Sequence, residues 1–196
     1  IELLFADPDE MILHQGYISS IDGVAQEDLC YGYSDDNKAT PRVERDYLLP
    51  MLRAARIENK TVLVTDYCSD PEKVDDSYDS NQNEGFVSFA AGRRELDSIP
   101  TYPPTPHDVN NENISEFEKI SNFLYLIDPE GYPDKGSYLD ALRGTDHDLL
   151  IIDPFYKGNP LTKSEVGSLK MKNNGGSRLV ISYMSIGEAE DYRYYW

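Results

Sequence analysis

Six short apolar runs, each followed by charged and mostly acidic residues, constrain the fold of this chain more than any other feature. The runs are rich in β-branched and aromatic residues and have the length of β-strands. They fall at residues 21–24, 62–64, 86–89, 123–127, 149–152 and 179–186. Nearly continuous apolar runs are typical of strands buried on both faces, so they predict a parallel sheet.

Helix signals separate most of these runs. The segment 40–60 has an amphipathic pattern, although Pro50 should kink or divide a helix there. A second helix is predicted within 136–145, and Thr162 followed by Glu165 is a capping-box pattern that predicts a third. The polar stretch DSYDSNQNEG, residues 76–85, predicts a loop.

Alternating strands and helices predict βα units in an α/β fold. Because acidic residues follow strand after strand, we expect a (β/α)8 TIM barrel, whose functional groups gather at the carboxyl ends of the strands. A doubly wound sheet is the alternative fold, but the glycine-rich first turn typical of it is absent from the sequence. Residues 98–115 carry four prolines without an apolar period, which predicts a linker between residues 1–97 and residues 116–196.

Composition excludes several classes of function. The net charge of −18 argues against a nucleic-acid partner, which requires clustered Lys and Arg. No apolar run approaches the roughly 20 residues of a membrane span. The two cysteines, Cys30 and Cys68, form no CxxC pair and the three histidines are scattered, so we expect no metal site and no cofactor. Whether the two thiols pair or stay free is open.

The segment ISYMSIGEAEDYRYYW, residues 181–196, resembles a signature of glycoside hydrolase family 114, the endo-α-1,4-polygalactosaminidase-like proteins, and of their bacterial and archaeal extracellular relatives. There it is similar to the third barrel strand and the loop that follows. NFLYLIDPE and HDLLIIDPF are similar to the first and second strands. IDGVAQEDLCYGY, KTVLVTDYC and EGFVSFAAGRREL are similar to the sixth, seventh and eighth.

The resemblance therefore implies the end of a barrel in residues 1–97 and the start of a barrel in residues 116–196. A piece of a protein with two tandem barrels would give this order, and so would a circular permutation. In a closed barrel strands eight and one are neighbours, so the order 6-7-8-1-2-3 is also compatible with one contiguous open sheet.

The resemblance also implies functional residues. Glu27 matches a catalytic Glu of the family, as acid/base or as nucleophile, whereas the matching catalytic Asp has no counterpart here. Substrate-binding roles are implied for Asp66, Tyr67, Asp153, Tyr183, Glu188, Glu190, Asp191 and Arg193. For the acidic ends of the strands, a structural role as turn formers is the alternative.

These matches imply a secreted or cell-surface bacterial glycoside hydrolase that acts on galactosamine-containing polysaccharide. With one catalytic carboxyl of two, we expect these 196 residues to be inactive alone. The alternative is a non-catalytic carbohydrate-binding or structural cell-surface barrel. An acidic protein attracts a cationic, deacetylated polymer, which agrees with either function.

Overall fold

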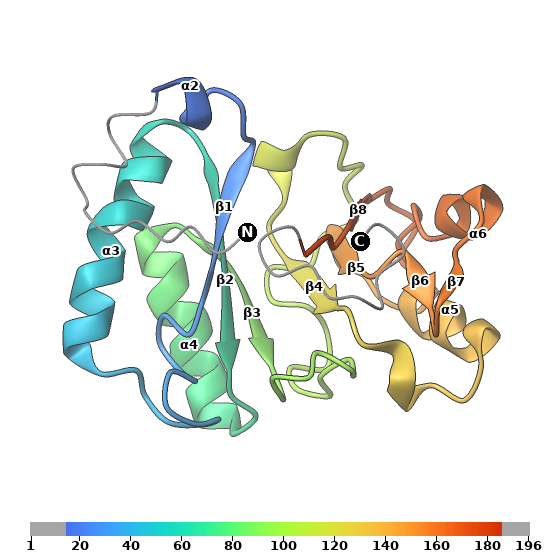
Figure 1. Cartoon of the computed structure of the whole chain (residues 1–196), viewed down its shortest axis with the longest axis horizontal. Helices are drawn as coiled ribbons and strands as arrows, with labels where there is room; N and C mark the ends of the chain where they lie inside the picture. Colours follow the sequence, from blue (N-terminus) through green and yellow to red (C-terminus); the bar gives the residue numbers. More distant parts are fainter. Residues whose placement is uncertain (1–14, 186–196) are drawn as a thin grey trace.

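The chain forms two small parallel sheets with helices packed beside them (Figure 1). The computed structural model describes residues 15–185. The strands of the two sheets are β1 Gly23–Glu27, β2 Thr61–Tyr67, β3 Val87–Ala91, β4 Phe123–Leu126, β5 Leu149–Ile152 and β8 Leu179–Ser182. The helices are α2 Gln15–Ile18, α3 Arg42–Ile57, α4 Pro71–Glu84, α5 Lys135–Arg143 and α6 Lys163–Ser168, with 3-10 turns η1 Phe117–Lys119 and η2 Pro129–Gly131. A short antiparallel pair, β6 Phe155–Tyr156 and β7 Asn159–Pro160, follows β5. The six apolar runs of the sequence are thus confirmed as parallel strands.

The predicted TIM barrel is wrong. One sheet has the order β1-β2-β3 and the other β4-β5-β8, and within residues 15–185 neither closes on itself. Strands β3 and β4 lie next to each other without pairing, so one contiguous sheet is not formed either. The physical reason lies between these strands, where the Phe89 and Phe123 rings pack with centroids 5.7 Å apart. Side-chain packing there replaces the hydrogen-bond ladder that a barrel requires.

Helix α4 occupies the segment that the sequence predicts as a loop. Asp70 begins it, with its side chain accepting a hydrogen bond from the Glu72 amide, and Gly85 ends it with a φ of 70°. The polar residues Ser77 and Asn81 lie on its buried face, where they find hydrogen-bond partners. The loop predicted for residues 76–85 from composition alone is therefore wrong. The capping box of Thr162 and Glu165 is confirmed at the start of α6, and α3 is not divided at Pro50.

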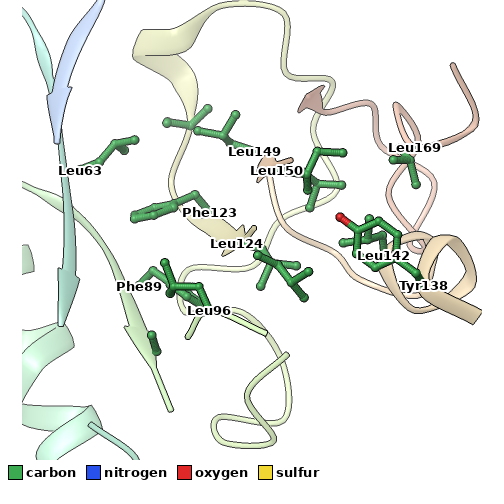
Figure 2. Close-up of a cluster of buried hydrophobic side chains, with 14 of the residues drawn as sticks. Leu63, Phe89, Leu96, Phe123, Leu124, Tyr138, Leu142, Leu149, Leu150 and Leu169 are labelled. Carbon is green, nitrogen blue, oxygen red and sulfur yellow. The ribbon is translucent and has the colours of Figure 1, made fainter. Parts of the chain in front are cut away.

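One hydrophobic core joins the two sheets (Figure 2). Phe89 from the first sheet packs against Phe123 from the second, and Leu96 lies beside Phe89 in the same cluster. The core then extends through β5 to the helical side of the second sheet. Its members there include Tyr138, Leu139, Leu142, Leu149, Leu150 and Leu169. A second cluster lies between α3 and the strands β1 and β2 of the first sheet.

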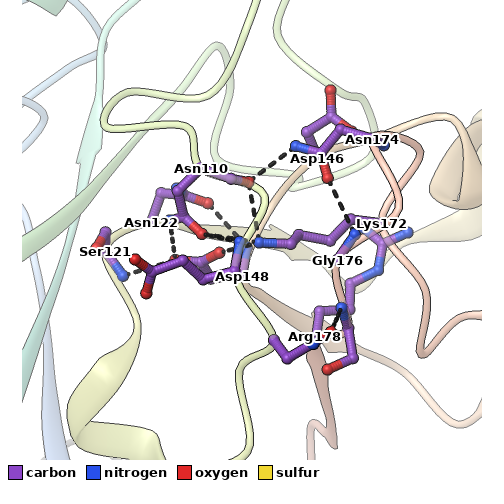
Figure 3. A network of polar contacts seen from close by, with 12 residues as sticks. Asn110, Ser121, Asn122, Asp146, Asp148, Lys172, Asn174, Gly176 and Arg178 are labelled. Carbon is purple, nitrogen blue, oxygen red and sulfur yellow. Dashed lines mark hydrogen bonds and ion pairs between the residues drawn. The ribbon is translucent and has the colours of Figure 1, made fainter.

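The segment 98–115, predicted as a linker, is held against both halves of the chain. The Tyr102 hydroxyl donates to Asp75 of α4. Farther along, Asn110 lies beside Asp148 and Lys172, whose side chains are both fully buried (Figure 3). Lys172 Nζ donates to the backbone and side-chain oxygens of Asn110 and to Asp148 Oδ1, at 2.9–3.0 Å. All three ammonium donors are therefore satisfied, which a buried charge requires.

We predict that Lys172→Met destabilises the fold by about 3–5 kcal/mol, because it leaves the Asp148 carboxylate buried without its cation. Urea unfolding measures the change. Lys163→Met removes the same charge from an exposed position on α6 and should change the stability little. Equal unfolding midpoints for the two variants would contradict this account of the buried pair.

Candidate functional site

An exposed carboxylate, Glu27, is the last residue of β1 and lies beside the end of β2. The register of the sheet pairs Glu27 with Thr65, two residues before Tyr67. The Tyr67 hydroxyl and the Glu27 carboxylate form a hydrogen bond. Burial raises the pKa of Tyr67 well above its ordinary value, and the charge and hydrogen bond of Glu27 raise it further. The phenol therefore remains a proton donor to this carboxylate at neutral pH.

Two tyrosines of the second sheet lie on the other side of the same region. Tyr125 lies in β4, and Tyr183 follows β8, where its amide donates to the Ile152 carbonyl at 2.8 Å. Their ring centroids are 6.1 Å apart, with the planes tilted by 47°. Burial raises the pKa of Tyr125, and the Glu27 charge adds to that effect, so the carboxylate of one sheet acts on a tyrosine of the other.

Arg94, after β3, fixes the loop that follows Glu27. Its guanidinium donates two hydrogen bonds to Asp28, at 2.9 and 3.1 Å, and a third to the Gly32 carbonyl. The same group lies over the Tyr67 ring, with Cζ 4.4 Å from the centroid. Gly32 has a φ of 120°, and a Cβ on it would lie 2.2 Å from Asp28 Oδ1, so only glycine fits there.

We call Glu27, Tyr67, Arg94, Tyr125 and Tyr183 the acid–tyrosine site. Its parts come from residues at or near the carboxyl ends of strands in both sheets. A backbone hydrogen bond also joins the two halves of the chain at this end of the strands. The Leu96 carbonyl after β3 accepts it from the Ile127 amide after β4, at 3.0 Å. A charged acceptor, a guanidinium and the half-buried rings of Tyr125 and Tyr183 are thus brought together. The Tyr67 ring is buried under Arg94, so Tyr67 contributes its hydroxyl and not a free face. Such a set suits a ligand that has hydroxyl or amine groups around a ring with C–H faces.

Asp66, predicted to bind substrate, is not part of this site because it is fully buried. Its Oδ1 accepts from the amides of Cys30 at 2.7 Å and Tyr31 at 3.1 Å. Its Oδ2 accepts from Ser77 Oγ at 2.6 Å and Asn81 Nδ2 at 3.0 Å. Asp66 therefore ties the loop after β1 and helix α4 to the end of β2.

Asp153, also predicted to bind substrate, is buried and accepts a hydrogen bond from the Phe155 amide at 2.9 Å. This is the turn-forming role of an Asp at the end of a strand. The predicted residues Glu188, Glu190, Asp191 and Arg193 lie outside the residues that the structure describes.

The sequence predicts neither Asp28 nor Tyr125 as part of this region, and it does not pair Asp28 with Arg94. Arg94 and Asp28 are separated by 66 residues, and no local pattern pairs them. Tyr125 is the polar-tipped residue in an otherwise apolar strand, FLYL, and it alone of the four strand residues is only half-buried. A residue with a hydroxyl within an apolar strand is the signal that could have found it.

The two cysteines are free and buried, and burial raises the pKa of each thiol to about 12. In the described part of the chain, no group of three His, Cys, Asp or Glu side chains gathers as metal ligands would. No helix within residues 15–185 has both the length and the apolar character to cross a membrane.

Comparison with known proteins finds a distant archaeal relative. Over 113 residues the chain is 36% identical to uncharacterized protein MJ1477 of Methanocaldococcus jannaschii. The alignment covers 57% of this chain but 31% of that protein, so the chain spans about a third of its relative's length. No known family profile matches the chain, and no solved structure matches it.

We predict that Arg94→Lys destabilises the protein by about 1–2 kcal/mol, since a lysine cannot replace the paired bonds to Asp28. Thermal unfolding measures the loss. The control is Arg42→Lys, where the ion pair with Asp46 is exposed and worth little. The account would be wrong about the Arg94 contacts should both variants melt like the parent protein.

Proposed function

We propose that the acid–tyrosine site binds galactosamine-containing polysaccharide as part of a glycoside hydrolase related to family 114. The observation that carries the proposal is the exposed Glu27 carboxylate, which is hydrogen-bonded by Tyr67 and whose charge raises the pKa of Tyr125. The resemblance of the sequence to that family supports the same substrate. Such a protein would be secreted or displayed at the cell surface, where these polymers occur.

The chemistry of the site agrees with an amino sugar. Tyrosine rings offer flat apolar faces for the C–H groups of a pyranose, with hydroxyls at their edges. A carboxylate forms a strong, charge-assisted hydrogen bond with a protonated amine. The net charge of −18 adds a long-range attraction for a cationic chain.

In hydrolysis, Glu27 would serve as one of two carboxyls, either as the proton donor and acceptor or as the nucleophile. Asp66 and Asp153 are buried, and Asp28 is paired with Arg94, so none of these three is placed to act as the second carboxyl. That observation favours a second candidate function, in which this part of the protein binds the polysaccharide without cleaving it. Release of new reducing ends distinguishes the two functions.

We predict that Glu27→Gln weakens the binding of an α-1,4-linked galactosamine oligosaccharide by roughly tenfold or more, because a charge-assisted hydrogen bond is worth about 1.5–3 kcal/mol. Isothermal titration calorimetry measures the affinity. Glu58→Gln is the matched control, since it makes the same change in net charge at an exposed residue after α3. The fully N-acetylated oligosaccharide, which lacks the cation, should bind less tightly than the free amine.

Three results would each oppose the proposal. They are no binding of either oligosaccharide, equal losses in the Glu27→Gln and Glu58→Gln variants, and tighter binding of the N-acetylated form. The same samples, assayed for reducing ends, decide between cleavage and binding alone.

A further inference from the structure

Helix α3 carries apolar side chains on its exposed face. The helix lies at the outer edge of the molecule, on the side of the first sheet that is away from the second (Figure 1). Among residues 15–185, eight large hydrophobic side chains are exposed, and three of them belong to α3. Of these, Val43 is 71%, Tyr47 is 44% and Ile57 is 77% exposed. Single exposed hydrophobic residues are ordinary, but a group of them on one element indicates an interaction surface.

The spacing of the apolar residues places them in one row along α3. The row, which we call the α3 stripe, has alternating intervals of four and three positions and consists of Val43, Tyr47, Pro50, Ala54 and Ile57. This is the spacing of a coiled-coil seam, so all five side chains lie on one side of the helix. The residues that α3 buries are others, namely Leu49, Met51, Leu52 and Ala55. The stripe is therefore separate from the face that holds α3 in the fold.

The α3 stripe is complementary to itself when a second copy is turned about a twofold axis through Pro50. Val43 and Ile57 lie seven positions before and after Pro50, so each faces the other residue type across the axis. Tyr47 and Ala54 lie three before and four after, so a large side chain meets a small one. Reciprocal contacts of this kind are the property of an isologous dimer interface.

The charges beside the stripe favour the antiparallel arrangement. Asp46 and Arg53 lie on the same side of α3, because seven positions are two helical turns, and their side chains are 59% and 55% exposed. Within one chain they pair with Arg42 and Glu84. The twofold axis brings Asp46 of each copy near Arg53 of the other, whereas parallel helices would bring like charges together. Such flanking charges set the orientation of paired helices.

We propose that the α3 stripe binds the α3 stripe of a second copy of this chain, as an antiparallel helix pair about a twofold axis at Pro50. A helix of 16 residues is about 24 Å long, so the contact is small. Interfaces of this size are typical of weak association, and we expect a dissociation constant in the micromolar range. The inference is independent of the proposed function, because it uses none of the residues of the acid–tyrosine site.

Sedimentation equilibrium of the 196-residue chain tests the proposal. At physiological ionic strength salt screens the net charge of −18, and the apparent mass should rise from one chain toward two across micromolar concentrations. Val43→Glu should weaken association about tenfold or more, because the twofold axis repeats each lost contact. The control is Val109→Glu, which makes the same change at an exposed residue outside the stripe and should dimerise like the parent. The mass of a single chain throughout, or equal dissociation constants for the two variants, would overturn the proposal.

A compensating pair of substitutions tests the antiparallel register. Ile57→Lys alone should also weaken association, whereas Val43→Glu and Ile57→Lys together should restore it, because the new carboxylate of one copy then faces the new ammonium of the other. Both positions are exposed, and an acidic residue in the first turn and a basic residue in the last turn favour a helix, so the variants should fold. Failure of the double variant to associate more tightly than either single variant would refute this register.

Discussion

The Asp66 carboxylate is the interaction on which the candidate site depends. It is fully buried at the end of β2 and accepts four hydrogen bonds from two other elements. Two of the donors are the amides of Cys30 and Tyr31, which belong to the loop that follows Glu27. Because an unpaired buried donor is costly, these bonds hold the loop in one position. The loop in turn presents Asp28 to Arg94, which lies against the Tyr67 ring.

The second constraint is the packing between the two sheets. Phe89 and Phe123 meet where a continuous sheet would have placed a hydrogen-bond ladder. This contact brings the ends of β1 and β2 near those of β4 and β8, so that Glu27 and Tyr125 interact although they belong to different sheets. On the other side, the buried pair of Lys172 and Asp148 fixes the segment 98–115 and thereby keeps the second sheet in place.

The strands could be predicted from the sequence because burial on both faces leaves an apolar run wherever a parallel strand lies. Helix α4 could not, since its buried face carries Ser77 and Asn81, whose partner Asp66 lies on another element. The barrel prediction failed for a related reason. The pairing of two strands depends on neighbouring side chains, here two phenylalanines, which the pattern of one strand does not reveal.

The same limit applies to the site. Glu27 and Asp66 both stand at or near the end of a strand, and local sequence gives them equal claims to bind a ligand. The structure separates them, because α4 and the loop after β1 cover Asp66 while Glu27 stays exposed. The most direct test is NMR of the chain labelled with ¹³C-tyrosine, titrated with a galactosamine oligosaccharide. We expect the resonances of the half-buried Tyr125 and Tyr183 to shift, and also that of the buried Tyr67 through its hydrogen bond to Glu27, while those of Tyr138 and Tyr156, which are not part of the site, do not. Shifts that spare the first three tyrosines, or no shifts at all, would contradict the account.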